Sequence, residues 1–118
     1  MLAQARWAVV GDVLHPRKPA RAVVERLEAA GKTVHRVSPR DRTGTLPKTL
    51  GAVAAAGEAI DVVDLIINPR DGIKVVEEMV ELGVRAVFIQ PGAGSEEIEA
   101  LCKREDIEVH NGCVLREL

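Results

Sequence analysis

The sequence predicts an α/β protein built on a parallel sheet of about five strands, with helices on both faces of the sheet. Short apolar segments rich in β-branched residues recur along the chain without clean alternation with polar residues, which is typical of strands buried on both faces. Between these segments lie others whose apolar residues recur with the period of a helix. An alternation of the two kinds implies parallel strands joined by right-handed crossovers.

The expected strands are short and evenly distributed. They span residues 6–10, 33–37, 61–67, 85–90 and 107–109. The first expected helix lies between the first two strands and carries apolar residues at positions i, i+3, i+4 and i+7. Those residues are Ala20, Val23, Val24 and Leu27, and Gly31 is expected to end the helix.

The later helices are marked by their caps. Asn68 followed by Pro69 is a favourable helix start, and Gly83 is the expected stop. Ser95 is the expected cap of the next helix, whose first turn is acidic. Residues 46–60 are predicted as either a short Ala-rich helix or an irregular crossover.

Length and composition limit the possible functions. At 118 residues we expect one domain, residues 1–118. Aromatic residues make up only 2% of the chain, which argues against single-stranded nucleic acid stacked on aromatic side chains. No apolar run of about 18 residues exists, so no membrane partner is expected. The N-terminus lacks the features of a signal peptide, and Cys102 and Cys113 look like reduced thiols, so we expect a cytoplasmic protein.

Charge is distributed unevenly along the chain. Residues 15–42 contain eight Lys or Arg and three acidic residues, whereas residues 71–108 contain ten acidic residues and four bases. A basic front half suits an anionic ligand. Two solvated helix faces of opposite sign explain the same pattern.

Four loops should form any ligand site, because ligands of parallel α/β sheets bind beyond the carboxyl ends of the strands. These loops hold many of the Gly, Pro and Asn residues of the chain, and we expect them to converge on one rim. They read Gly11-Asp12-Val13, Ser38-Pro39-Arg40, Asn68-Pro69-Arg70 and Gln90-Pro91-Gly92-Ala93-Gly94.

The first loop matches neither of the common nucleotide motifs. It contains only Gly11, so it is neither a G-x-G-x-x-G fingerprint nor a Walker loop. Backbone N–H groups at the following helix start, together with Lys18 and the flanking Arg17 and Arg21, are suited to holding a diphosphate. A purely structural glycine turn fits the same residues.

The order of motifs along the whole chain resembles the CoA-binding domain family. The first loop of that family typically reads G-A-S-x-x-P-x-K-x-G-x-x-V, and the spacing of Gly11, then Pro16, Lys18, Pro19, Ala20 and Val23 here is similar to it. The segments 37–39, 61–69, 90–92 and 112–113 are similar to the V-N-P, D-V-V-D-to-Pro, Q-x-G and terminal cysteine motifs of the family. The resemblance extends from about Arg6 to Leu118.

This resemblance implies a Rossmann-like, three-layer α/β/α domain that binds coenzyme A or acyl-CoA. Similar domains occur in the α subunit of succinyl-CoA synthetase and in ADP-forming acyl-CoA synthetases, and small stand-alone members also exist. In the family the first loop and its lysine hold the CoA phosphates, the second loop borders the adenosine end, and the other two line the remaining cleft. Carried over, the cofactor-binding residues are Gly11, Asp12, Val13, Lys18, Ser38, Pro39, Arg40, Asn68, Pro69, Gln90, Pro91 and Gly92.

The chain departs from the family pattern inside these loops. Asp12 and Val13 replace Ala and Ser, so a hydroxyl donor is missing and a carboxylate stands where it would repel a diphosphate. Ala20 replaces a glycine at the helix start, and Ser38 replaces an asparagine. These differences bear on affinity for CoA more than on the fold.

No catalytic group is expected. No Ser, Cys or His has an evident base and orienting acid beside it, and the chain has no room for a phosphohistidine or ATP-grasp domain. A metal at Asp12 is not expected either, because Arg40 and Arg70 oppose a cation and only Asp71 offers a second acid nearby. The partners we expect are a CoA ligand and, from the apolar tail at residues 115–118, a second copy of the chain or a ligase subunit.

Two other functions remain open at this stage. The first is an NAD(P)- or nucleotide-binding enzyme on the same scaffold. The missing second glycine argues against it, whereas Arg36 and Arg40 suit an extra phosphate on NADP as well as on CoA. The second is an interaction module that has lost its ligand, for which Asp12 is the motivating residue.

Overall fold

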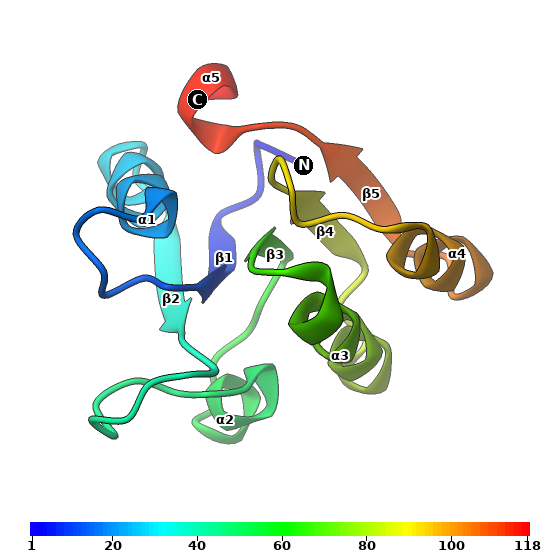
Figure 1. The fold of residues 1–118 in the computed structure, drawn as a ribbon, viewed down its shortest axis with the longest axis horizontal. Helices are drawn as coiled ribbons and strands as arrows, with labels where there is room; N and C mark the ends of the chain where they lie inside the picture. Colours follow the sequence, from blue (N-terminus) through cyan, green and yellow to red (C-terminus); the bar gives the residue numbers. More distant parts are fainter.

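A computed structural model describes all residues 1–118 and contains a five-stranded, fully parallel sheet in the order β2-β1-β3-β4-β5 (Figure 1). The strands are β1 (Arg6–Gly11), β2 (Thr33–Val37), β3 (Val62–Ile66), β4 (Ala86–Ile89) and β5 (Glu108–Asn111). The predicted α/β class, the parallel sheet and the Rossmann-like arrangement are confirmed.

Helices cover both faces of the sheet. They are α1 (Pro19–Ala29), α2 (Leu50–Ala55), α3 (Pro69–Leu82), α4 (Glu96–Arg104) and α5 (Val114–Glu117). Figure 1 shows α1 and α5 on one face and α2, α3 and α4 on the other, which gives three layers. None of these helices is long and apolar enough to cross a membrane.

The helix boundaries follow from local caps. Asn68 and Ser95 accept hydrogen bonds from the first turns of α3 and α4, and Gly83 ends α3 in the left-handed conformation at φ 73°. In the uncertain segment 46–60, only Leu50–Ala55 is helical. Its start is held by Glu78 of α3, which accepts from the backbone N–H groups of Leu50 at 2.8 Å and Gly51 at 2.9 Å.

Successive residues of each strand point to opposite faces, so the sheet separates two apolar clusters. One cluster joins Ala8 and Val10 to α2, α3 and α4, while the other joins Trp7 and Val9 to α1 and α5. Trp7 packs against Phe88 in the second cluster, with ring centroids 6.0 Å apart. Its indole Nε1 donates to the carbonyl oxygen of Gln4 at 2.8 Å, so the one buried tryptophan leaves no donor unpaired.

Asp64, in the middle of β3, is the one carboxylate buried inside the sheet, with no exposed surface. Its Oδ1 accepts a 3.3 Å hydrogen bond from Nε2 of Gln90, and its Oδ2 has no hydrogen-bond partner. Burial raises the pKa of the Asp64 carboxyl well above its usual range, and the bond from Gln90 only partly offsets this. Asp64 is therefore protonated at pH values where an exposed aspartate is charged.

We expect Asp64→Asn, which keeps the shape and removes the charge, to stabilise the protein at neutral pH. Below about pH 4 the Asp64 carboxyl is protonated in both the folded and the unfolded state. As the pH rises, the unfolded chain releases this proton while the folded protein keeps it. The contribution of Asp64 to stability then falls by about 1.4 kcal/mol per pH unit until its folded-state pKa is reached.

Urea denaturation of both proteins between about pH 4 and about pH 8 tests this expectation. The difference in the free energy of unfolding between the variant and the wild type should grow with pH. A difference that stays constant over this range would show that Asp64 is not buried in its neutral form.

Candidate functional site

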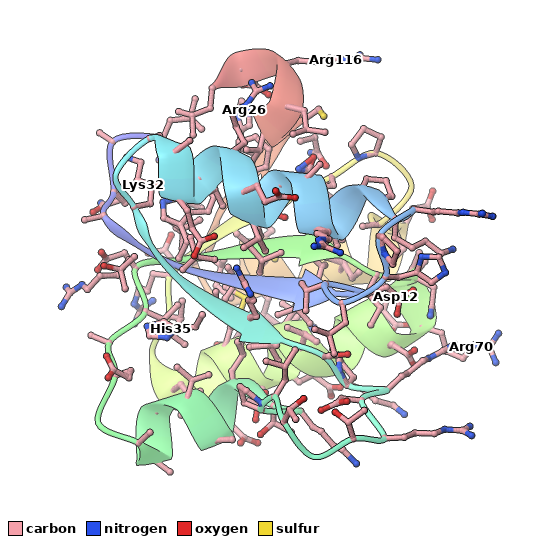
Figure 2. The ribbon with its side chains drawn as sticks, turned by 90° about the vertical axis from the view of Figure 1, so that its left-hand side faces the viewer. Asp12, Arg26, Lys32, His35, Arg70 and Arg116 are labelled. Atoms are coloured by element: carbon pink, nitrogen blue, oxygen red, sulfur yellow. The ribbon has the colours of Figure 1, made fainter.

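A cleft of about 360 Å³ opens at the carboxyl ends of the strands, between the ends of β1 and β3. It is lined by Asp12, Lys18, Pro19, Ala20, Arg40, Ile66, Ile67, Asn68, Pro91, Gly92 and Ala93. Figure 2 shows Asp12 and Arg70 at this end of the molecule and Lys32 at the opposite end. Each of the four loops selected from the sequence contributes to the cleft wall.

The strand order explains why the cleft lies here. From β1 the chain crosses to β2 on one side of the sheet, and β3 then pairs with β1 on the other side. The loops after β1 and β3 therefore diverge, and a crevice forms at this switch in direction. The 2-1-3-4-5 order with a ligand site between the first and third strands is the flavodoxin-like variant of the doubly wound fold.

The start of α1 presents unpaired backbone donors to the cleft. Lys18 is the N-cap residue, yet no side chain accepts from the first turn, and that turn contains no acidic residue. Pro19 lies at the start of the helix, where its missing N–H costs nothing. Because Lys18 forms no ion pair within the protein, its ammonium and the free N–H groups are available to an anion.

Asp12 is exposed in the same cleft and forms an ion pair with neither Lys18 nor Arg40. Its backbone carbonyl accepts from the N–H of His15 at 3.2 Å, which starts the turn leading to α1. The ring Nδ1 of His15 accepts from the N–H of Arg17 at 3.1 Å, so His15 shapes the loop and does not line the cleft.

Arg40 is held at the mouth of the cleft by Asp71, a residue of the first turn of α3. Its guanidinium lies 3.0 Å from Asp71 Oδ2, which also accepts from the side chain of Asn68 at 2.9 Å. Hydrogen bonds from Asn68 and Arg40 lower the pKa of Asp71. Because its carboxylate is engaged in this way, Asp71 is not free to join Asp12 around a cation.

The loop that carries Arg40 is shaped by Asp41. The Asp41 carboxylate accepts from the hydroxyl of Thr43 at 2.6 Å and from the backbone N–H groups of Thr43 and Leu46, both at 3.0 Å. These bonds, with that of the Thr43 hydroxyl the largest, lower the pKa of Asp41 to about 2. Asp41 therefore stays charged at all ordinary pH values and keeps the loop after β2 in one shape.

Of the residues carried over from the family, the structure brings six together in the cleft. They are Asp12, Lys18, Arg40, Asn68, Pro91 and Gly92. The others lie outside it, namely Gly11, Val13, Ser38, Pro39, Pro69 and Gln90.

The residues outside the cleft have structural positions. The side chains of Val13 and Ser38 are buried, with 3% and 6% exposure, and Pro39 lines a separate groove of about 630 Å³ beside α3. Pro69 is the first residue of α3. Gln90 is 2% exposed and points into the layer beneath the cleft, where its amide contacts Asp64.

Gly11 is needed where β1 and β3 approach each other. It pairs with Ile66 in the sheet, and a Cβ atom at Gly11 would collide with the carbonyl oxygen of Ile66. Its backbone φ is not in the left-handed region, so the requirement is for space and not for an unusual conformation. The structural interpretation of this glycine is therefore supported by a specific contact.

Some lining residues were not selected as site residues from the sequence. Ile66 is the last residue of β3 and Ile67 follows it, just before Asn68, while Ala93 is a buried residue of the last loop. An apolar residue at a strand end carries no polar group that would mark it as a ligand contact. The only indication in the sequence is therefore its position at the end of a strand. The sequence offers Asp71 only as a second acid near Asp12, because spacing along the chain does not show that Asp71 pairs with Arg40.

Comparison with known proteins agrees with the fold. The model of the CoA binding domain family matches residues 5–118, nearly the whole chain. The chain belongs to the CoA-binding domain family. The resemblance noted from the loop motifs is therefore confirmed, and the family supports CoA binding in general terms.

Solved structures show the same fold. A conserved hypothetical protein from Pyrococcus furiosus is 25% identical with a TM-score of 0.84, and the alignment covers 98% of this chain and 100% of that one. A hypothetical protein from Pyrococcus horikoshii OT3 is 22% identical with a TM-score of 0.86, covering 98% and 83% of the two chains. A structure from Thermus thermophilus is 26% identical with a TM-score of 0.79, covering 97% and 87%.

Gly11→Ala is expected to lower the free energy of unfolding by about 1–3 kcal/mol, because the added methyl group forces β1 and β3 apart. Gly94→Ala is the matched control, since a Cβ there would lie 3.4 Å from the nearest atom, a side-chain carbon of Ile89. Urea denaturation of both variants measures the effect. Equal stability of the two variants would argue against the close approach at Gly11.

Proposed function

We propose that this protein binds coenzyme A or an acyl-CoA in the cleft between β1 and β3 and performs no chemistry on it. The observation that carries the proposal is the uncapped start of α1 beside Lys18, in a chain that belongs to the CoA-binding domain family. The other long helices, α3 and α4, have side-chain caps, so α1 alone among them offers free N–H groups to a diphosphate.

The charged residues of the cleft fit an anionic ligand with one exception. Lys18 and Arg40 come from different loops and face the same space, so they would contact the phosphates from two sides. Asp12 opposes them, because no cation within the protein neutralises its carboxylate. The proposal therefore predicts weaker CoA binding than the basic residues alone would give.

The proposal that no chemistry takes place rests on the residues around the cleft. No His or Cys lines it, and Asp12 is its only acid. Cys113 lies in the C-terminal segment and Cys102 in the core, where burial raises the pKa of its thiol to about 11. If the protein takes part in acyl-CoA ligation, we expect a partner chain to supply the reaction.

Native mass spectrometry of freshly purified protein, followed by calorimetric titration with CoA, NADP and ATP, tests the proposal. Micromolar binding of CoA with much weaker binding of NADP supports it. Tighter binding of NADP favours the alternative nucleotide-binding enzyme. Failure of all three ligands to bind refutes both and leaves the interaction module.

Lys18→Ala should weaken CoA binding about tenfold or more, because a charge-assisted contact to phosphate is lost. Lys103→Ala is the control. It removes the same charge from the last turn of α4, at the opposite end of the sheet. Calorimetry measures the dissociation constants, and thermal unfolding checks that both variants are folded. An unchanged dissociation constant for Lys18→Ala would exclude a phosphate contact.

Asp12→Asn should strengthen CoA binding by roughly threefold to tenfold at low salt, because a negative charge beside the phosphates is removed. The gain should shrink as salt is added. Asp106→Asn is the control, because it removes one negative charge at a turn far from the cleft. Residue 106 has a left-handed backbone with φ 56°, a conformation that asparagine accepts. Weaker binding by Asp12→Asn would mean that the carboxylate organises the loop instead of repelling the ligand.

A further inference from the structure

The wall of the cleft formed by Pro91, Gly92 and Ala93 is a tight reverse turn. The carbonyl oxygen of Gln90 accepts from the N–H of Ala93 at 3.0 Å, and Gly92 has φ 85°. Proline at the second position and a glycine of positive φ at the third define a type II turn. The orientation of this wall therefore depends on how its first residue, Gln90, is held.

Gln90 is tied to three other parts of the molecule. Its backbone N–H donates to the carbonyl oxygen of Leu65 at 3.1 Å. Its side-chain Nε2 donates to Asp64 at 3.3 Å, and its Oε1 accepts from the backbone N–H of Val114 at 3.3 Å. The side chain uses a donor and an acceptor at once, which among uncharged residues of this length only glutamine provides.

Val114 belongs to a C-terminal segment, residues 112–118, that packs beside α1. The Val114 side chain is fully buried, and Arg26 of α1 donates to the carbonyl oxygen of Leu115 at 3.1 Å. Glu117 of the segment contacts His110 of β5 at 2.7 Å and accepts from the N–H of Cys113 at 3.1 Å. Figure 2 shows α5 above α1, with Arg26 reaching toward it and Arg116 pointing away.

The segment therefore contacts two elements that both line the cleft. On one side it packs on α1, whose first residues Pro19 and Ala20 line the cleft. On the other side it binds Gln90, from which the Pro91–Gly92 turn begins. We propose that Gln90 is a positioning residue, which transmits the docking of the C-terminal segment to the turn that walls the ligand cleft.

A positioning role for Gln90 differs from the direct ligand contact that the family resemblance implies for this residue. A side chain that is 2% exposed and turned into the α1 layer cannot reach a ligand in the cleft. Its effect on binding must pass through the turn. The effect on affinity rests on the proposed CoA function, whereas the effect on the turn can be measured without any ligand.

Val114→Pro is the most specific test, because it removes the N–H that donates to Gln90. Val114 is the first residue of α5, a position that accepts proline, and Cys113 before it has φ −131° and ψ 118°, as a residue preceding proline requires. Val114→Ala is the matched control, since it trims a similar part of the side chain and keeps the N–H.

The readouts are hydrogen exchange of the Ala93 amide in the ligand-free protein and the dissociation constant for CoA. Val114→Pro should speed Ala93 exchange at least about fivefold relative to Val114→Ala and weaken CoA binding by a similar factor. Gln90→Met, which has nearly the same volume and no amide, should do the same. If Gln90→Met does not fold, the comparison of Val114→Pro with Val114→Ala still tests the positioning role of Gln90.

A swapped pair separates positioning from general destabilisation. In Gln90→Glu combined with Asp64→Asn, the new Asn amide can donate to the new carboxyl group, which still accepts from Val114. Exchange at Ala93 should be faster in Gln90→Glu alone and slow again in the double variant. Ile107→Ala truncates a buried side chain just before β5 and is the control for general destabilisation. It should speed Ala93 exchange no more than its loss of global stability accounts for.

The outcomes distinguish the two proposals. Ala93 exchange that is the same in Val114→Pro as in Val114→Ala, and the same in Gln90→Met as in the wild type, overturns the positioning role. Faster exchange with an unchanged dissociation constant for CoA also overturns it, because the turn would then not matter to the ligand. If the wild type does not bind CoA, the proposed function fails, and the exchange measurements still decide whether Gln90 holds the turn.

Discussion

The pairing of β1 with β3 is the constraint on which the rest of the structure depends. The two strands run parallel in register from Trp7 to Gly11, and at Gly11 they approach so closely that a side chain has no space. This pairing places the loops after both strands at one edge of the sheet. The cleft, the start of α1 and the Asn68 cap all take their positions from it.

The same pairing buries the carboxyl group of Asp64, whose ionisation inside the core is unfavourable. Asp64 is the middle residue of β3, and it pairs with Val9 of β1 and Phe88 of β4. A charged carboxylate there is so poorly solvated that the group keeps its proton. What this residue provides is an acceptor for Gln90, and through Gln90 it links the centre of the sheet to the C-terminal segment. We therefore explain the buried carboxyl group of Asp64 by its contact with Gln90, the residue at which the Pro91–Gly92 turn begins.

The charged side chains of the cleft differ in whether they have an ion-pair partner within the protein. Arg40 is paired with Asp71 at the surface, whereas Lys18 and Asp12 have no ionic partner in the protein. A phosphate bound by Arg40 would share its guanidinium with Asp71, while the ammonium of Lys18 is shared with no carboxylate of the protein. The uncompensated carboxylate of Asp12 sets this chain apart from the usual family loop, and it changes the charge of the site without changing the fold.

Sequence periodicity and caps were enough to predict the α/β class, the five strands and three of the helices, because burial of apolar faces and satisfaction of helix ends are local requirements. They also identified the four loops, since parallel strands must all end at the same edge. Neither α5 nor the contacts of Asp71 and Gln90 were predictable. Asp71 meets Arg40 across 31 positions of sequence and Gln90 meets Val114 across 24, so only the folded chain brings them together. Sequence by itself therefore determined which loops form the cleft, and tertiary packing alone decided which side chains face it and which support it from beneath.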